Sequence, residues 1–398
     1  MQLTSEEQSM LAGQQGPAIR KAMEILVALG AIYGAKEMVP VSSVQIAGVS
    51  YDNLGEAGLH FLSQMSEGGA RTKVLATLNP AGMDVENWQV LGISPEFAEQ
   101  QLRVIDAFAR MGVVTTCTCT PYLSGNNPHF GEHIAWAESS AVCYANSVIG
   151  ARTNREGGPS ALAAALTGRT PLYGYHQESQ RLPDILVEVM GKPAGTHEFG
   201  ALGKVIGEKL GKLQGKKLPF LQGIVQASVD ELKSFCASLA TYGGAAMFHM
   251  EDITPEAGAA ALPSESISVS RQELEQAVDS LNDPDAEIDF ISLGCPHLSI
   301  VEIQRLAGLL QGRQVTREFW VTTSRAVKSI ADRVGYSQVI EASGAKFAVD
   351  TCCVVAPIRG RFKTLLTDSA KACYYAYSKN KFNTVYRSFD EVVQEALR

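Results

Sequence analysis

The last third of the chain alternates short apolar runs with amphipathic stretches, and this alternation restricts the possible fold more than any other feature. The apolar runs, which predict buried strands, are residues 288–293, 319–322 and 347–350. The stretches 299–310 and 324–334 between them have the periodicity of helices. Strands joined through single helices form right-handed crossovers and lie parallel in one sheet. We therefore expect a parallel α/β lobe over residues 286–398.

Residues 1–285 carry the same signals less regularly. Apolar runs predict strands at residues 44–47, 74–78, 113–116 and 185–190. Periodic stretches predict helices at residues 95–111, 132–148 and 228–242. Residues 251–285 are rich in Pro, Ser, Glu and Asp, which indicates a surface connection. The chain of 398 residues is therefore predicted to be α/β, with several α/β/α lobes built on parallel sheets and a boundary between residues 285 and 286.

Charge and hydropathy argue against several classes of protein. The chain has no run of about 18 apolar residues, so we expect no transmembrane helix and no membrane partner. Its first residues are polar and acidic, without the apolar segment of a signal peptide, which predicts a cytoplasmic protein. A net charge of −8 without a basic block argues against a nucleic-acid partner. The eight cysteines of such a protein are not expected to form disulfides.

Three cysteines lie where an expected strand gives way to a loop. They are Cys119, Cys295 and Cys352, and each follows an apolar run and precedes a turn or helix signal. In an open α/β sheet the carboxyl ends of the strands converge on the functional site. Three thiolates from three strand ends can therefore hold an iron–sulfur cluster with one iron left free, and such an iron is a Lewis acid. This interpretation points to a metal-assisted lyase.

A structural role is the competing interpretation, because buried cysteines most often behave as small hydrophobic residues. The cysteines in helical patterns, which this interpretation fits best, are Cys143, Cys236 and Cys373. Cys117 and Cys353 are possible cluster ligands in place of their neighbours Cys119 and Cys352. Side chains alternate along an extended segment, so Cys117 and Cys119 should face the same way, and Cys352 and Cys353 opposite ways. Only one cysteine of each close pair is needed for a cluster.

Turns at the ends of two early strands offer backbone N–H groups to an anion such as a carboxylate or a phosphate. One turn contains Gly48, Val49 and Ser50, and the other contains Asn79 and Pro80. Taken alone, each turn is better explained as an ordinary tight connection.

Single charged side chains give weaker signals. Glu138 and Ser139 lie in a helical pattern beside Trp136, where a buried Glu can meet a substrate hydroxyl, although a Glu in such a pattern is usually solvated. Lys371 offers a point charge for a carboxylate or a phosphate, and a solvated helix face is the alternative.

Other motifs are less informative. Arg152, Asn154 and Arg155 precede a Gly-Gly-Pro-Ser turn and can clamp an anion, with a surface salt bridge as the alternative. The histidines have no metal-ligand spacing such as His-Glu-x-x-His, and His297 stands out because it follows Cys295 and a proline. Neither a Gly-x-Ser-x-Gly nor a Walker motif is present, so hydrolase and NTPase functions lack support.

Longer segments of the chain resemble a known family. They are residues 119–122 (Cys-Thr-Pro-Tyr), 131–140 (Gly-Glu-His-Ile-Ala-Trp-Ala-Glu-Ser-Ser) and 145–155 (Ala-Asn-Ser-Val-Ile-Gly-Ala-Arg-Thr-Asn-Arg). These segments are similar to aconitase X, and the resemblance runs over essentially the whole chain. Within the family, residues 48–53 and 154–160 are most similar to the branch that dehydrates (R)-5-phosphomevalonate. They differ from the branch that acts on cis-3-hydroxy-L-proline.

The resemblance implies an aconitase-like arrangement of lobes around a central [4Fe–4S] cluster held by Cys119, Cys295 and Cys352. It also implies substrate contacts from Gly48, Val49, Ser50, Asn79, Pro80, Glu138, Ser139 and Lys371. The implied reaction is loss of water from a phosphorylated hydroxy acid, (R)-5-phosphomevalonate, which gives trans-anhydromevalonate 5-phosphate on a mevalonate route to isoprenoids. The free iron would bind the leaving hydroxyl group.

One part of the aconitase pattern is missing from this chain. Enzymes of this kind need a swivelling domain, which supplies a serine base in this family, and residues 363–398 are too few to form it. We therefore expect a separate small subunit to carry the swivel domain and the base. Dehydration of cis-3-hydroxy-L-proline is the alternative enzymatic function. A cluster-bearing sensor or binding protein without turnover is the alternative of another class.

Overall fold

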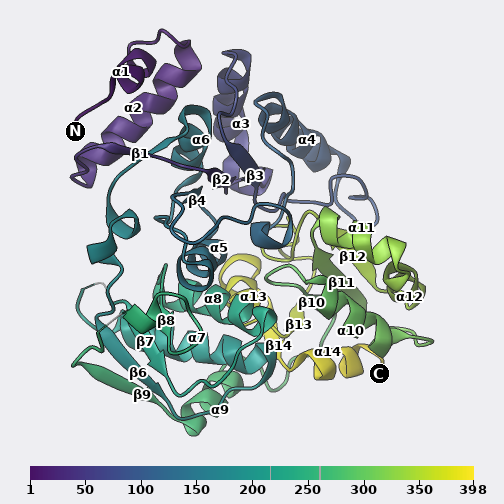
Figure 1. Ribbon diagram of the computed structural model, residues 1–398. Helices are drawn as coiled ribbons and strands as arrows, with labels where there is room; N and C mark the ends of the chain where they lie inside the picture. Colours follow the sequence, from purple (N-terminus) through teal and green to yellow (C-terminus); the bar gives the residue numbers. More distant parts are fainter. Residues whose placement is uncertain (216, 260) are drawn as a thin grey trace.

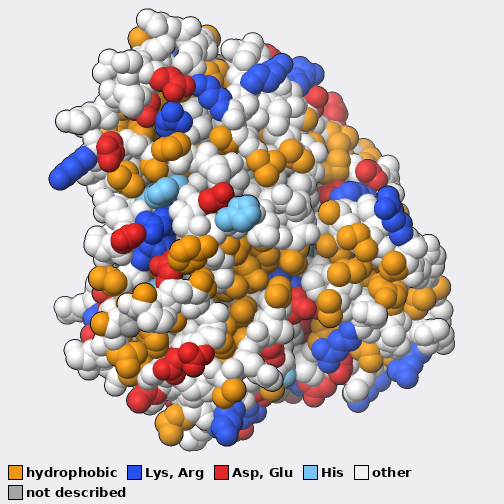
Figure 2. All heavy atoms as spheres, viewed as in Figure 1, with side chains coloured by type: hydrophobic (Ala, Val, Ile, Leu, Met, Phe, Trp, Pro, Cys, Tyr) orange, Lys and Arg blue, Asp and Glu red, His pale blue; other side chains and the backbone are white. Residues whose placement is uncertain are grey.

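The computed structural model describes residues 1–215, 217–259 and 261–398. These residues form three α/β regions that meet at a centre occupied by α5 (Ser139–Tyr144), α8 (Val229–Gly243) and α13 (Ala370–Tyr375) (Figure 1). Figure 2, drawn from the same side, shows hydrophobic side chains gathering over this centre. The predicted α/β class with several parallel sheets is confirmed. Within the described part of the chain, no helix is both long enough and apolar enough to cross a membrane.

The first region, at the top of Figure 1, is built on a parallel three-stranded sheet in the order β3-β2-β4. Its strands are β2 (Ser43–Ile46), β3 (Leu75–Leu78) and β4 (Ala135–Trp136). Its helices are α1 (Ser5–Leu11), α2 (Pro17–Ile32), α3 (Tyr51–Glu67), α4 (Pro95–Arg110) and α6 (Gly158–Thr167). An antiparallel pair of short strands, β1 (Met38–Pro40) with β5 (Arg169–Pro171), completes the region.

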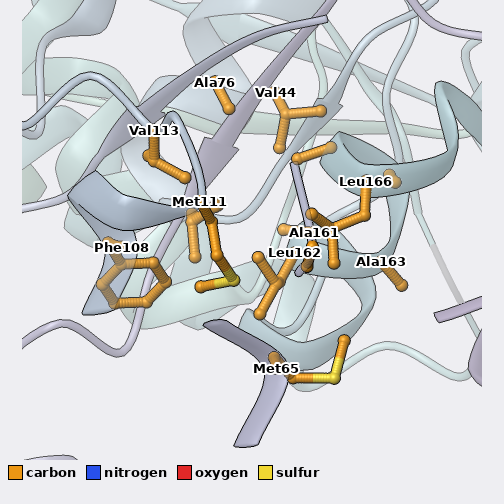
Figure 3. Close-up of a cluster of buried hydrophobic side chains, with 14 of the residues drawn as sticks. Val44, Met65, Ala76, Phe108, Met111, Val113, Ala161, Leu162, Ala163 and Leu166 are labelled. Carbon is orange, nitrogen blue, oxygen red and sulfur yellow. The ribbon is translucent and has the colours of Figure 1, made fainter. Parts of the chain in front are cut away.

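Hydrophobic side chains from the sheet and its helices fill the core of the first region. Figure 3 shows Val44 and Ala76 from the sheet, Phe108 from α4, and Leu162 and Leu166 from α6, all of which are buried. Complete burial of one large aliphatic or aromatic side chain contributes about 1.5–3 kcal/mol to stability. This packing fixes β2 and β3, whose carboxyl ends lead into the turns predicted to bind an anion.

The second region is built on a parallel four-stranded sheet in the order β8-β7-β6-β9. Its strands are β6 (Ile185–Val189), β7 (Pro219–Gln222), β8 (His249–Met250) and β9 (Ser266–Val269), and its helices are α7 (Gly195–Gly211), α8 and α9 (Arg271–Asp279). Helices α7 and α8 pack very closely, because a Cβ atom on Gly203 would lie only 2.7 Å from the carbonyl oxygen of Phe235. A larger side chain there would push α8 out of the centre.

The third region is built on a parallel five-stranded sheet in the order β12-β11-β10-β13-β14. Its strands are β10 (Phe290–Leu293), β11 (Glu318–Thr323), β12 (Lys346–Val349), β13 (Thr364–Thr367) and β14 (Asn383–Tyr386). Its helices are α10 (Ile300–Leu310), α11 (Arg325–Arg333), α12 (Tyr336–Ala342), α13 and α14 (Phe389–Ala396). The boundary that we placed between residues 285 and 286 stays a prediction.

Two predictions about individual elements are wrong. Residues 113–116 form no strand, because Val114 makes only a single bridge to the sheet and the N–H of Thr116 turns back to the Val114 carbonyl. Residues 132–148 are not one helix, because β4 pairs with β2 and α5 begins only afterwards. Residues 251–285, which we predicted to include a surface connection, also contain β9 and α9. Pairing between distant segments, which local periodicity does not report, decided these cases.

Candidate active site

The predicted substrate residues all follow the carboxyl ends of parallel strands. In the first region, β2 leads into Gly48, Val49 and Ser50, β3 leads into Asn79 and Pro80, and β4 leads into Glu138 and Ser139. In the third region, β13 leads into Lys371. Open α/β sheets bind ligands at this edge, so the topology brings residues that are far apart in the sequence to the functional side of both sheets.

Cys295 and Lys371 lie where the strand order of the third sheet reverses direction. From β10 the order runs through β11 to β12, and from the neighbouring β13 it runs to β14. Cys295 follows β10 and Lys371 follows β13, while Cys352 follows β12 at the same edge. A crevice at such a switch point is the usual binding site of an open α/β sheet.

The three strand-end cysteines are approached through left-handed turns. Residues with positive φ one or two positions before them are Cys117 (44°), Gly294 (107°) and Asp350 (65°). A Cβ atom on Gly294 would lie 2.2 Å from the carbonyl oxygen of Thr322, so only glycine fits there. These turns change the direction of the chain just before each cysteine.

A buried ion pair joins the first and third regions. The Nζ atom of Lys371 donates to Oε1 of Glu138 at 2.6 Å, and the two side chains are 9% and 11% exposed. Oε1 of Glu138 also accepts from the hydroxyl of Ser140 at 3.0 Å, and its Oε2 accepts from Nδ2 of Asn79 at 2.8 Å. Burial alone would raise the pKa of Glu138, but Lys371 and these other donors outweigh burial and lower it to about 2. The Glu138 carboxylate is therefore charged at neutral pH.

The thiols of the strand-end cysteines are close enough to influence one another electrostatically. Burial raises the pKa of Cys119 to about 12, and the charges of Glu138 and Cys352 act in the same direction, while Lys371 opposes them. Burial also raises the pKa of Cys295 and of Cys352, and Lys371 opposes both shifts. A thiolate here is therefore unfavourable without a cation, and a bound metal centre would supply one.

The three cysteines supply thiol donors, the kind of ligand that holds an iron–sulfur cluster. Across residues 1–215, 217–259 and 261–398, no group of three His, Cys, Asp or Glu side chains is placed to hold one ion. In a cluster each thiolate binds a different iron atom, so the sulfur atoms lie farther apart than the ligands of one ion. Cys119 and Cys352 are buried and Cys295 is partly exposed. Three such thiols beside a charged pair therefore have the donor chemistry of cluster ligands.

The structure separates each pair of neighbouring cysteines. Cys117 belongs to the hydrophobic core of the first region, and Cys353 packs with Phe290 and Trp320 in the third. The positive φ of Cys117 means that its segment is not extended, so the alternation argument for Cys117 and Cys119 does not apply. Burial raises the pKa of the thiols of Cys117 and Cys353. Cys119 and Cys352 therefore remain the predicted ligands of each pair.

A buried glutamine, which the sequence analysis missed, braces both turns that are predicted to bind an anion. Oε1 of Gln101 accepts from the backbone N–H of Tyr51 at 2.9 Å and of Gly82 at 3.0 Å, and its Nε2 donates to the carbonyl of Val49 at 2.9 Å. Within the part of the chain that the structure describes, the N–H groups of the Gly48–Ser50 turn have no acceptor. Gln101 thus holds a turn whose own donors face no partner. The sequence indicated its burial only through its position on the apolar face of the predicted helix 95–111.

A second buried glutamine links the turns to the cysteines. Nε2 of Gln45 donates to the carbonyl of Thr118 at 3.0 Å and contacts Oδ1 of Asn79 at 3.4 Å. Its Oε1 accepts from the backbone N–H of Glu138 at 3.2 Å. Gln45 is fully buried in β2, where a polar residue within an apolar strand was the only sign of its role.

Contacts between the regions set the distance from the turns to the Cys352 loop. The hydroxyl of Ser50 donates to the carbonyl of Val355 at 3.0 Å, and the N–H of Ala81 donates to the carbonyl of Asp350 at 2.8 Å. Arg325 binds the carboxylates of both Asp84 and Asp350. The first and third regions are therefore joined by several hydrogen bonds and ion pairs beside the candidate site.

Two of the three residues predicted to clamp an anion before the Gly-Gly-Pro-Ser turn, Arg152 and Asn154, already have protein partners. Arg152 pairs with Glu178 at 3.0 Å, as the salt-bridge alternative proposed. The side-chain amide of Asn154 bonds to the backbone of Tyr173 and Tyr175, so this residue shapes the local chain. Ser139 is buried at the start of α5, and its role stays a prediction, as do the roles of the other substrate residues and of the three cysteines.

Comparison with known families identifies the class of protein to which this fold and site belong. Residues 1–179 match the first domain of aconitase X, residues 183–279 match its second domain, and residues 288–398 match its third domain. The chain therefore belongs to the aconitase X family, as its sequence segments predicted.

Individual relatives are similar over most of their length. The large subunit of phosphomevalonate dehydratase from Methanocaldococcus jannaschii is 44% identical over 405 residues, which cover 99% of this chain and 100% of that protein. The cis-3-hydroxy-L-proline dehydratase of Pseudomonas aeruginosa is 35% identical over 388 residues, which cover 94% of this chain and 66% of that enzyme. The crystal structure of the holo-form of aconitase X from Thermococcus kodakaraensis superposes with a TM-score of 0.93 at 41% identity and full coverage of both chains.

Proposed function

We propose that this chain is the large subunit of a hydro-lyase that converts (R)-5-phosphomevalonate to trans-anhydromevalonate 5-phosphate, on a mevalonate route to isoprenoids. The 44% identity to an archaeal phosphomevalonate dehydratase large subunit supports this substrate over cis-3-hydroxy-L-proline, whose dehydratase is 35% identical. The structural observation that carries the proposal is the buried Lys371–Glu138 pair, which lies within electrostatic reach of Cys119 and Cys295.

The proposal includes a [4Fe–4S] cluster held by Cys119, Cys295 and Cys352. The mutual electrostatic influence of these buried thiols and the family membership of the chain support this assignment. When bound, the cluster supplies an iron atom that acts as a Lewis acid toward the hydroxyl group that leaves.

The chain's own residues bind and orient the substrate. The N–H groups of the turn formed by Gly48, Val49 and Ser50 donate to one anionic group of the substrate, and Asn79 and Pro80 shape the facing turn. Lys371 carries the positive charge for the carboxylate or the phosphate. Glu138, held as a carboxylate, and Ser139 beside it accept hydrogen bonds from substrate hydroxyl groups. Burial of this pair excludes water, which strengthens each electrostatic contact.

Removal of the proton requires a base, and we assign this base to a separate small subunit that carries the swivel domain. The name of the archaeal relative, a large subunit, supports a two-chain enzyme. The hydroxyproline dehydratase supports it as well, because about a third of that enzyme lies outside the region matched by this chain.

The experiment combines this chain, reconstituted anaerobically with iron and sulfide, with its small subunit and offers phosphomevalonate or cis-3-hydroxy-L-proline under identical conditions. We expect loss of water from phosphomevalonate only when both chains are present. Faster dehydration of the amino acid would favour the hydroxyproline alternative. A stable cluster without turnover of either compound would favour a sensor or binding protein. Full activity of the isolated chain would contradict the assignment of the base to a partner.

A further inference from the structure

His297 contacts the segments of all three proposed cluster ligands. These ligands are Cys119, Cys295 and Cys352. The side chain of His297 is fully buried, with Nδ1 3.0 Å from the hydroxyl of Thr118 and Nε2 2.9 Å from the carbonyl oxygen of Thr351. Thr118 and Thr351 directly precede the first and third ligands, and His297 itself stands two positions after the second. One imidazole ring therefore bridges segments that come from two regions of the molecule.

The partners of the ring determine which nitrogen carries the proton. A carbonyl oxygen can only accept, so Nε2 of His297 must donate to Thr351. In a neutral imidazole the other nitrogen is then an acceptor, and Nδ1 receives the hydroxyl proton of Thr118. Both ring nitrogens are satisfied in one orientation of the ring, so neither segment can shift without breaking a buried hydrogen bond.

The backbone of His297 is held as firmly as its ring. Its N–H donates to Sγ of Cys119 at 3.3 Å, and its carbonyl accepts from Nζ of Lys233 at 3.1 Å. Lys233 is buried and pairs with Asp230 and Glu302. The ring orientation therefore rests on a fixed main chain, and the N–H of His297 points at a sulfur atom that the cluster would use.

We propose that His297 is a positioning residue that holds the three cysteine-bearing segments in their cluster-binding arrangement, an inference that rests on the proposed cluster. Residues that orient metal ligands without touching the metal commonly change metal affinity about 10- to 100-fold when they are replaced. The buried histidines elsewhere in the described chain offer a control, because His249 also bonds to a backbone carbonyl, that of Arg181 at 2.7 Å, but in the second region.

The test uses a set of variants that remove the bridges of His297 one at a time. His297→Leu removes both ring contacts. His297→Asn keeps an acceptor near the position of Nδ1, and His297→Gln keeps a donor near the position of Nε2. Thr118→Val removes one partner and leaves the ring in place. His249→Gln is the matched control for loss of a buried histidine.

The measured quantities are the iron bound per chain after anaerobic reconstitution, the rate of iron release to a chelator, the EPR spectrum of the reduced protein, and the unfolding midpoint of the apoprotein. We expect His297→Leu to release iron about 10- to 100-fold faster than the wild type with an altered EPR spectrum. The Asn, Gln and Val variants should show smaller increases, because each of them removes only part of the bridge made by the ring.

Two results would separate this inference from the proposed function. A wild-type chain that takes up no cluster would contradict the proposed function itself. A wild-type chain that takes up a cluster and variants that release iron at the wild-type rate would contradict only the role of His297. A lowered unfolding midpoint in both His297→Leu and His249→Gln, with unchanged iron release, would likewise mean that His297 is merely structural. If His297→Leu does not fold, the rates of iron release from His297→Asn and Thr118→Val are compared with the wild-type rate instead. Release at the wild-type rate from both variants would contradict the role of His297.

Discussion

Two sets of three cysteines lie in different surroundings, although five of the six cysteines are buried. The strand-end cysteines are Cys119, Cys295 and Cys352, and the core cysteines are Cys143, Cys236 and Cys373. The core cysteines lie in the hydrophobic core of the second region among residues such as Phe235 and Phe248. The strand-end cysteines lie beside Glu138 and Lys371, at turns with positive φ.

The difference shows that burial does not identify a metal ligand. Burial raises the pKa of Cys236 and Cys373 in the core set, just as it raises the pKa of the strand-end thiols. The strand-end set is distinguished by the charge of Lys371, which opposes the rise in the pKa of each of its three thiols. The influence of this charge, more than the degree of burial, therefore marks the candidate site.

Replacing single cysteines tests the comparison most directly and should have the largest effect. Cys119→Ala, Cys295→Ala and Cys352→Ala should each lose most of the bound iron after anaerobic reconstitution, because a cluster with three protein ligands has no substitute for a missing thiolate. Cys143→Ala should bind as much iron as the wild type. Normal iron content in all three strand-end variants would contradict the assignment of these cysteines as ligands.

Replacing the buried lysine should have the next largest effect. Lys371→Ala removes a charge-assisted contact worth roughly 1.5–3 kcal/mol, so kcat/KM for phosphomevalonate should fall about ten- to a hundred-fold while iron content is unchanged. Lys204→Ala is the matched control, because Lys204 also pairs with a glutamate, Glu208 at 2.9 Å, but away from the cysteines. An unchanged kcat/KM in Lys371→Ala would mean that the Lys371–Glu138 pair takes no part in substrate binding or catalysis.

The pH dependence of the free energy of unfolding tests the contribution of the Lys371–Glu138 ion pair. In the wild-type apoprotein the pKa of Glu138 is lowered to about 2, so its carboxylate contributes stability above its unfolded pKa and loses it as pH falls toward 2. Without Lys371, burial dominates and raises the pKa of Glu138, so the charged form destabilises the fold until protonation relieves it at acid pH. The stability deficit of Lys371→Ala should therefore shrink as pH falls from 8 to about 4. Chemical unfolding across this range measures it, and a deficit that is constant with pH would contradict the pairing.

Removing a core cysteine should have the smallest effect. Cys143→Ala removes one buried sulfur atom from a hydrophobic core, so the apoprotein should lose about 1 kcal/mol of its free energy of unfolding. The same measurement on apo Cys119→Ala should give no larger loss, because a polar site has less hydrophobic packing to lose. Denaturant titration measures the free energy of unfolding of both variants. A larger loss of this free energy in Cys119→Ala than in Cys143→Ala would mean that Cys119 is a core residue.

Local patterns in the sequence were sufficient for the parts of the fold that depend on local periodicity. The strands at residues 44–47, 74–78 and 319–322 were placed to within a residue or two, because buried parallel strands are continuous apolar runs. The strands β13 and β14 were not anticipated. The helix expected over residues 132–148 failed because β4 is defined by its pairing with β2 rather than by its own residues.

The candidate site shows the same limit. Cys119, Cys295 and Cys352 could be selected because each ends an apolar run. Gln45 and Gln101 could not be assigned roles, because those roles consist of hydrogen bonds to residues far along the chain, such as Thr118 for Gln45 and Gly82 for Gln101. A single amide in an apolar pattern marks a buried polar residue, but its partners are known only when the chain is folded.

The contact between Ser50 and Val355 has a consequence for the biosynthesis of the protein. It joins residues that are 305 positions apart, and Cys352 and Lys371 lie close to the C-terminus. During translation the first region can fold as soon as it leaves the ribosome, since domains generally fold in the order of their synthesis. Its half of the site then waits, with the Gly48–Ser50 turn facing solvent, until the third region has been synthesised. The proposed cluster could therefore be inserted only after Cys352 has joined the site.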